Sequence, residues 1–314
     1  MTAAPLGGRP GGDRGGSIYD LGYRGYEGPR LGRRAAIAAL LTHTLRTAYG
    51  LGRSTRSKVM PVGLVVLAIL PALLGVGFIV LFAQLGPAGE AMEAVEAFSP
   101  FRYSTLFPFT YVLVFLFSAS QAPELFGRDQ LAGVLPLYFS RAISRLDYAM
   151  ARLLGLFVAL LVLVFAPQII LFIGRILVAS DLATGLSDEL PELPATLAVG
   201  LIITTLVGSL SGAIAALTPR RSYATVAIIA VFLIPSIFAG FLVSNGVGLL
   251  GQAAILLSPG GVLEGVNAVL FGVPPEDEIV RQADIEGWVY LAAAAAWIIG
   301  SLALLASRYR RMAL

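Results

Sequence analysis

The sequence predicts an all-α integral membrane protein, because its composition is strongly apolar and it contains six long hydrophobic runs. Of the 314 residues, 57% are hydrophobic and only 13% are charged, whereas a soluble domain has about 25% charged residues. Each run is long enough to supply the ~20 residues of a bilayer-spanning helix, and their interiors contain no Asp, Glu, Lys or Arg. The runs cover residues 60–85, 101–121, 153–173, 194–218, 222–244 and 287–306.

Four of these runs contain an interior proline, which we expect to kink a helix rather than end it. The residues are Pro71, Pro108, Pro167 and Pro235. A membrane-spanning helix tolerates proline where its neighbours supply a partner for the freed carbonyl group. We therefore predict continuous helices through all four positions.

The chain ahead of the first run divides into a tail and a short helix. Residues 1–32 are rich in Gly, Arg, Pro and Tyr and lack the apolar segment of a secretory signal, so we predict a flexible cytoplasmic tail. Residues 33–52 carry Ile37, Leu40 and Leu41 at helical spacing. The apolar part is too short to cross a bilayer, and we predict an amphipathic helix in the membrane interface.

Basic residues are segregated to one side of the predicted spans. They crowd the stretch before the first run, the loops after the second and fourth runs, and the C-terminus. The opposite side receives only Arg102, Arg175 and Arg281 and holds most of the acidic residues. Cytoplasmic loops carry an excess of Lys and Arg. Both termini are therefore predicted to face the cytoplasm, with the six-helix domain of residues 60–307 in a bacterial inner or plasma membrane.

One further apolar segment, residues 246–272, competes with the count of six spans. A Pro-Gly-Gly sequence that begins at Pro259 interrupts it, and Glu264 follows. A seventh crossing would also place the arginines of the C-terminal residues 308–314 outside the cell, against the positive-inside rule. We predict two short half-helices at the outer face, before the last span.

Residue types missing from the chain exclude several chemistries. Cysteine is absent, so neither a disulfide framework nor a thiolate centre is possible. The single histidine, His43, cannot form a His-Glu-x-x-His metalloprotease site, and we interpret it as a polar-face residue rather than a ligand. The segment GRSTRSKV at residues 52–59 has the length of a P-loop but lacks its second glycine and its magnesium-binding hydroxyl. We predict no enzymatic activity, no metal, no cofactor and no nucleic-acid binding in this chain.

The lack of ionisable residues in the spans also makes some of the remaining membrane functions less favoured than others. Ion-coupled carriers usually place ionisable residues within their spans, so this class is the least favoured, although sodium sites built from backbone carbonyls stay open. A membrane scaffold or accessory subunit that transports nothing fits the same lack of polar groups and stays open as an alternative.

The loop between the second and third runs, residues 124–152, combines apolar, aromatic and basic residues. We expect a short helix around residues 133–140, lying along the membrane surface. Protein–protein hot spots are enriched in Tyr and Arg, which favours a docking site; an interfacial loop with its aromatic residues at headgroup level is the alternative. The predicted docking residues are Glu124, Arg128, Asp129, Leu135, Pro136, Leu137, Tyr138, Phe139, Ser140, Arg141 and Arg145.

The sequence of this loop, GRDQLAGVLPLYFSRAISRLDYAMARLLG, resembles the signature between the second and third spans of type-2 ATP-binding-cassette (ABC) transporter permeases. In that family a polar residue ends the second span, and a Leu-rich coupling helix, a Ser-Arg-Pro-x-Ser-Arg-like turn and a lysine follow. Glu124 and residues 135–139 occupy the corresponding positions, with Ala142 in place of the usual proline and Arg152 in place of the lysine. The tail sequence YDLGYRGYEGPRLGRR also resembles that of actinobacterial permeases of this class.

The resemblance implies the transmembrane permease subunit of an ATP-driven exporter for an amphipathic, lipid-like or drug-like substrate. Two permeases, identical or paralogous, would form the path among the membrane lipids. Each coupling helix would rest on one of two cytoplasmic ATPase subunits that bind ATP and Mg²⁺. The spans that line the path in this family suggest candidates on the second and fifth runs, for which helix packing or lipid contact is the alternative. These candidates are Tyr111, Phe115, Ser118, Ser120, Pro235, Ser236 and Phe238.

Overall fold

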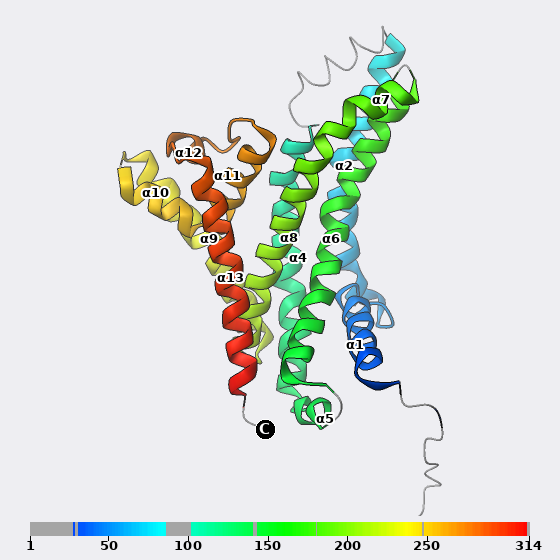
Figure 1. Ribbon diagram of the computed structural model, residues 1–314, viewed down its shortest axis with the longest axis vertical. Coiled ribbons are helices and arrows are strands. Elements are labelled where there is room, and N and C mark those ends of the chain that lie inside the picture. Colours follow the sequence, from blue (N-terminus) through cyan, green and yellow to red (C-terminus); the bar gives the residue numbers. More distant parts are fainter. Residues whose placement is uncertain are drawn as a thin grey trace, which may run out of the picture. The chain divides into compact units, whose positions relative to one another are not determined.

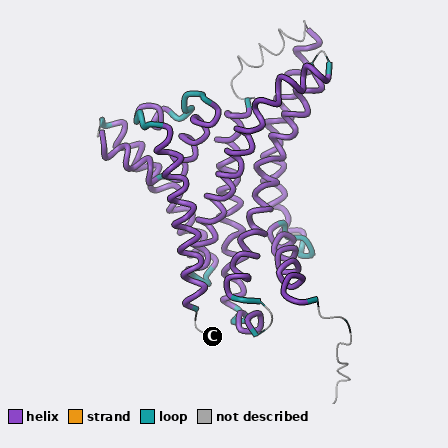
Figure 2. The backbone as a smooth tube through the Cα atoms, in the orientation of Figure 1, coloured by secondary structure: helices purple, strands orange, loops and turns teal. Residues whose placement is uncertain are grey.

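All regular secondary structure in the part of the chain that the structure describes is helical (Figure 2). The computed structural model describes residues 28, 31–85, 102–140, 143–179, 181–246 and 248–312, with only the backbone for residues 82–85. The predicted tail, residues 1–32, lies almost entirely outside these ranges. From Gly32 onward the chain forms one compact unit.

Within the described residues, six helices are long and apolar enough to cross a membrane (Figure 1), which makes the chain a multi-pass membrane protein. They are α2 (Thr55–Leu85), α4 (Tyr103–Leu131), α6 (Arg145–Val178), α8 (Leu193–Leu217), α9 (Arg221–Ser244) and α13 (Gly287–Arg311). The shorter helices are α1 (Gly32–Ala48), α5 (Leu135–Phe139), α7 (Leu182–Glu189), α10 (Gly248–Leu257), α11 (Pro259–Phe271) and α12 (Glu278–Gln282), and the 3-10 turn η2 (Leu190–Glu192) joins α7 to α8. The predicted all-α class and the six spans are confirmed.

Two of the spanning helices are longer than the apolar runs that predicted them. α4 continues past residue 121 to Leu131, and α6 begins at Arg145 rather than at residue 153. The added turns contain charged residues such as Glu124 and Arg152. They remain helical because partners from other helices neutralise these charges, as described below.

Two prolines of α4 are accommodated by hydrogen bonds from other helices. Pro108 has no N–H for the carbonyl of Ser104, and the side-chain amide of Asn267 on α11 donates to that carbonyl at 2.9 Å. Pro123 likewise frees the carbonyl of Ala119, which accepts from the hydroxyl of Thr225 on α9 at 3.1 Å. Both helix interruptions are therefore repaired by neighbours, as a low-dielectric bilayer requires. The helices that contain Pro71, Pro167 and Pro235 are also continuous.

Glycines let two pairs of helices approach closely. A β-carbon built on Gly174 of α6 would lie 2.1 Å from a methyl of Val76 on α2, and one built on Gly265 of α11 would lie 2.2 Å from the ring of Tyr290 on α13. Helices in membranes associate by such close packing because lipid tails are as apolar as leucine. These two contacts fix α2 against α6 and α11 against α13.

α10 and α11 form a re-entrant pair that begins and ends on the same side of the bundle. α9 begins at Arg221, which pairs with Glu124 near the end of α4. α13 ends near the start of α6, where Arg145 donates to the carbonyl of Arg310. α9 and α13 thus each cross the bundle once and are connected at its far end, to which α10 and α11 return (Figure 1). The axes of the two short helices are bent by 93°.

Side chains supply hydrogen bonds to backbone groups at the break between α10 and α11. The hydroxyl of Ser258 accepts from the backbone N–H of Gly261 and lies 2.7 Å from the hydroxyl of Ser236 on α9. The indole of Trp297 on α13 donates to the carbonyl of Leu256 at 3.1 Å. Irregular backbone at membrane depth is tolerated where protein shields it in this way.

The two ends of the bundle differ in charge. The α5 end, where α4 ends, α6 begins and α13 ends, carries arginines of the predicted cytoplasmic loops. The α12 end, where α9 ends and α13 begins, carries the acidic residues of α7, α11 and α12 (Figure 1). This separation follows the distribution of charge that the sequence predicted.

Candidate functional site: the α5 end of the bundle

α5 is a single short helix that displays an apolar residue to the surroundings. Gly133, with φ +65°, turns the chain out of α4, and Pro136 lies in the first turn of α5, where its missing N–H costs no hydrogen bond. The side chain of Leu137 is 67% exposed. The predicted helix around residues 133–140 thus occupies Leu135–Phe139.

Aromatic rings hold α5 against the ends of α6 and α13. The ring of Tyr148 on α6, which is fully buried, lies 5.3 Å from that of Tyr138 and 6.0 Å from that of Phe139, the latter edge to face. On its other side, Tyr148 lies 5.8 Å from the ring of Tyr309 on α13. Such ring pairs stabilise a contact beyond the area that they bury. α5 is therefore fixed to two spanning helices through one tyrosine.

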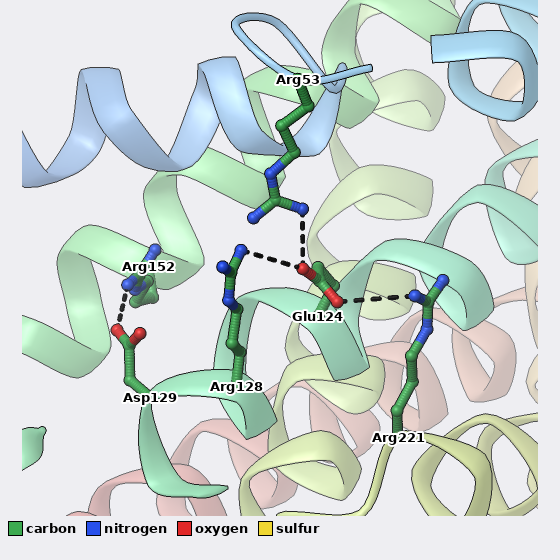
Figure 3. Close-up of polar contacts among 6 residues, drawn as sticks. All are labelled: Arg53, Glu124, Arg128, Asp129, Arg152 and Arg221. Carbon is green, nitrogen blue, oxygen red and sulfur yellow. Dashed lines mark hydrogen bonds and ion pairs between the residues drawn. The ribbon is translucent and has the colours of Figure 1, made fainter. Parts of the chain in front are cut away.

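Below this aromatic cluster, a buried ion pair connects α1, α4 and α6. Arg152, with a side chain only 3% exposed, pairs with Asp129 and donates to the hydroxyl of Thr44 at 3.2 Å. The hydroxyl of Tyr148 donates to Asp129 at 2.7 Å. A buried charge is tolerated when it is paired and hydrogen-bonded in this manner. Its counterpart Asp129 lies on α4 (Figure 3).

A second carboxylate at this end gathers three arginines. Glu124, 17% exposed on α4, accepts from Arg53 at 2.7 Å, from Arg128 at 3.4 Å and from Arg221 at 3.5 Å. Arg53 comes from the turn between α1 and α2, Arg128 from the next turn of α4, and Arg221 from the start of α9 (Figure 3). The guanidinium groups of Arg128 and Arg221 are mostly exposed. One carboxylate therefore joins three segments that are distant in the sequence.

α1 is attached to α6 at the same end. Asp147 accepts two hydrogen bonds from Arg33, at 2.6 and 2.8 Å, and completes the capping box of α6 with Ser144. The carboxylate raises the pKa of Arg33. The hydroxyl of Tyr49 donates to the carbonyl of Ala159 at 2.8 Å, and burial raises the pKa of this phenol to about 12. It therefore remains a hydrogen-bond donor at neutral pH.

His43 lies on α1 and is exposed. Partial burial of the imidazole, and then the charge of Arg152, lowers its pKa. Among the described residues, no group of three or more His, Cys, Asp or Glu side chains is placed to hold a metal ion. The interpretation of His43 as a polar-face residue agrees with its exposure.

The predicted docking residues divide into surface and structural groups. Leu137 and Ser140 face outward, and Arg128 is exposed. Glu124 and Asp129 instead point into the bundle and hold helices together, while Arg141 lies outside the described residues. Leu135, Pro136, Tyr138 and Phe139 form the body of α5, and Arg145 donates to the carbonyl of Arg310.

Several residues that contact this site could not be predicted from the sequence. Arg53 and Arg221 pair with Glu124 from distant positions in the chain. Tyr148 contacts Tyr138 and Phe139, and Tyr309 contacts Tyr148 in turn. A capping-box pattern, Ser144 followed by Asp147, was the one local signal that α6 begins this early.

The predicted path residues do not form one surface within this chain. Ser118 and Phe115 lie in the core, and Phe115 contacts Phe232 with ring centroids 4.9 Å apart. Ser120 is buried, Pro235 is half-buried, and Phe238 is 62% exposed on α9. Tyr111 and Ser236 are the exception, since both line a cavity of about 260 Å³ near the α12 end.

Comparison with protein-family models finds none that matches this chain, and comparison with curated proteins finds no match either. The functional conclusion therefore depends on the site itself and on the resemblance of residues 124–152 to the permease signature.

Proposed function

We propose that the chain is the transmembrane permease subunit of an ATP-driven ABC transporter. The observation that carries the proposal is α5, a short helix between the second and third spanning helices that displays Leu137 and is held rigidly from behind. Arginine is enriched at protein-docking hot spots, and exposed arginine at this end lies near the exposed Leu137 of the supported helix.

The contacts between α5 and the spanning helices would transmit a movement of α5 to the membrane domain. Movement of α5 would displace Tyr148, which belongs to α6 and contacts α13 through Tyr309 and α4 through Asp129. A closing ATPase dimer that pulls on α5 would thus tilt several spanning helices together, which is a rigid-body type of switch. ATP and Mg²⁺ would bind to the ATPase subunits, one beneath each of two permease copies.

The proposed orientation places the α5 end in the cytoplasm of a bacterial cell. Arg53, Arg128, Arg145 and Arg221 lie at this end, and basic residues mark the cytoplasmic side. α1 would then lie in the inner membrane interface, and the re-entrant pair would lie at the outer face. An exported amphipathic molecule would be received between two such chains, since the residues proposed for its path are divided between core and surface in one copy.

Co-purification with the ATPase encoded beside this chain tests the proposal. Leu137→Asp should abolish complex formation and the stimulation of ATP hydrolysis, because it places a charge in the centre of an apolar contact. Leu182→Asp on α7 is the matched control, since Leu182 is 65% exposed but lies at the opposite end. Unchanged binding and ATPase activity for Leu137→Asp would exclude docking through α5. Tyr138 is unsuitable for this test because its ring supports the fold.

A membrane scaffold that carries no cargo is the second candidate, favoured by the filled interior of the chain. Large side chains such as Phe117, Phe126 and Leu160 are fully buried in its centre. Reconstituted vesicles that contain the permease and its ATPase separate the two candidates. A transporter moves an amphipathic reporter when ATP is added, and a scaffold binds the ATPase without any ATP-dependent movement.

A further inference from the structure

We propose that the cavity between α4, α9, α11 and α12, near the α12 end, binds the ammonium headgroup of an amphiphilic amine. The inference does not depend on ATP coupling or on a partner subunit. Three features carry it, namely the arrangement of polar groups in the cavity, carboxylates that pair with no described Lys or Arg, and a tyrosine hydroxyl without a hydrogen-bond partner among the described residues, beside a glycine that admits no side chain. The cavity is called the α4–α12 cavity below.

The polar groups of the α4–α12 cavity are ordered by depth. Its inner part carries the hydroxyl of Tyr111, about two turns inside α4, that of Ser236, about two turns before the end of α9, and that of Ser258, which bonds to Ser236. Carboxylates lie nearer the bundle end, from Glu264 on α11 and from Glu276 and Asp277 in the loop before α12. Apolar walls between them are formed by Pro108, Ile255 and Val280.

The three carboxylates make no ion pair within the described part of the chain. The side chain of Glu264 accepts from the backbone N–H of Glu276 at 2.8 Å, and that of Asp277 caps α12 at the N–H of Ile279. Arg281 of α12 is engaged elsewhere, because its guanidinium pairs with Glu278 at 3.0 Å and donates to the carbonyl of Pro275. Like charges gathered without a cation favour a positively charged ligand.

At Gly260 the inner wall comes so close to the hydroxyl of Tyr111 that a side chain would press against it. A β-carbon built on Gly260 would lie 3.1 Å from the hydroxyl oxygen of Tyr111 and 3.6 Å from that of Ser236. The hydroxyl of Tyr111 makes no hydrogen bond to any described residue, although its ring contacts Phe232. The hydroxyls of Ser236 and Ser258 bond to each other. An entering N–H group would therefore find a free acceptor on Tyr111.

The size of the cavity limits the ligand to a headgroup. About 260 Å³ is below the range of roughly 300–1,000 Å³ that holds a drug-sized molecule. The face of α9 beside Ser236 carries exposed apolar residues, including Ile237 and Phe238. A hydrocarbon tail attached to the ammonium group can lie on this face, as in the acyl region of a membrane. The carboxylates at the same time exclude an anionic headgroup.

Saturable binding of radiolabelled dodecylamine to the full chain in neutral-lipid nanodiscs tests the proposal, with empty nanodiscs to subtract partition into lipid. Unlabelled dodecylamine should compete, and dodecyl sulfate, with the same chain and a negative charge, should not. Glu264→Gln and Glu276→Gln should each weaken binding by roughly tenfold, as expected for one close charge pair at a half-buried site. Equal displacement by the sulfate would show that only the chain is bound and would overturn the proposal.

Two further variants keep the test decisive. Glu278→Gln removes a carboxylate on α12 that pairs with Arg281 and does not line the cavity, so binding should change by less than about twofold. Gly260→Leu places a side chain against the hydroxyls of Tyr111 and Ser236 without changing the charge, and should abolish saturable binding. Normal binding by Gly260→Leu, or an equal loss with Glu278→Gln, would exclude this cavity as the site.

Discussion

At the scale of single residues, the hydrogen bonds around the prolines of α4 show how distant side chains complete a helix. Asn267 and Thr225 each donate to the carbonyl that a proline leaves free four residues earlier in the chain. Each side chain thus replaces the backbone N–H that proline lacks. In an apolar environment an unpaired carbonyl costs more than the bond itself contributes, so these two contacts fix α11 and α9 against α4.

Replacement of Asn267 should therefore be costly only while Pro108 is present. Asn267→Leu should lower the free energy of unfolding by about 1–3 kcal/mol, the cost of a buried unsatisfied carbonyl. In a Pro108→Ala background the alanine N–H can bond to Ser104, and the loss should fall by about half or more. Thermal and SDS unfolding of the purified chain measure both values.

The second proline supplies a matched control for that cycle. Thr225→Val should couple to Pro123→Ala, because they share the carbonyl of Ala119, and should be additive with Pro108→Ala. Additive effects for Asn267→Leu and Pro108→Ala would mean that the bond to Ser104 contributes nothing to stability.

The pH dependence of amine binding follows from Glu276, which lies in the loop between α11 and α12. Burial, and then the charge of Glu264, raises the pKa of Glu276 above its ordinary value of 4.5. A raised pKa means that this carboxylate loses its charge at a higher pH than a free one. The amine stays protonated throughout, since alkyl amines titrate near the ~10.4 of lysine. Dodecylamine binding should therefore weaken as the pH falls toward the raised pKa of Glu276.

Variants of the charged groups near the cavity can show which group causes the pH dependence of dodecylamine binding. Glu264 and Asp277 share the cavity, and burial also raises the pKa of Glu264. Arg281 and Glu278 lie on the adjacent helix as a pair. The pH profile, measured in nanodiscs between neutral and mildly acidic pH, should become flatter in Glu276→Gln and keep its shape in Glu278→Gln. A profile that Glu276→Gln leaves unchanged would assign the titration to another group.

At the scale of helices, sequence reasoning located α5 but underestimated the length of α4. α5 was predictable because Leu, Tyr and Phe cluster in a polar loop. The end of α4 was not, because a charged residue such as Glu124 normally marks the edge of a span. Its charge is neutralised by Arg53 and Arg221, which lie far away in the sequence and are not visible as partners without the fold. The same holds for Arg152 at the start of α6.

The attachment of α5 should depend on the ring of Tyr148 rather than on its hydroxyl. Tyr148→Phe retains the ring contacts to Tyr138 and Phe139 and loses only the two hydrogen bonds of the hydroxyl, to Asp129 and from Arg152. Tyr148→Ala removes the support altogether. Amide hydrogen exchange of residues 137–140 should therefore accelerate by about tenfold or more in the alanine variant, equivalent to at least ~1.4 kcal/mol of lost protection.

The phenylalanine variant is the control for the hydroxyl. It should keep exchange in α5 close to that of the parent chain, although Asp129 and Arg152 lose one hydrogen bond. Equal acceleration in both variants would assign the support of α5 to the polar network instead of the aromatic cluster.

At the scale of the whole molecule, the fold separates six crossings from one re-entrant pair. The composition of residues 246–272 fitted either a span or two half-helices, and the sequence decided between them through the Pro-Gly-Gly break, Glu264 and the C-terminal arginines. The contacts of Arg221 with Glu124 and of Arg145 with Arg310 give an independent reason, since they place the start of α9 and the end of α13 at one end. Arg53, just before α2, also pairs with Glu124 at this end. The chain therefore enters the first span and leaves the last span at the same end of the bundle, which requires an even number of crossings.

This topology predicts the side from which single cysteines can be labelled, and the absence of natural cysteine makes the parent chain a clean background. Leu137→Cys on α5 and Arg310→Cys at the end of α13 should react with a membrane-impermeant maleimide only after cells are permeabilised. Glu278→Cys on α12 should react in intact cells. Labelling under denaturing conditions controls for expression. Arg310→Cys and Leu137→Cys on opposite sides would require a seventh span. Reaction of Leu137→Cys in intact cells would place α5 outside the cell, where no ATP-driven partner could reach it.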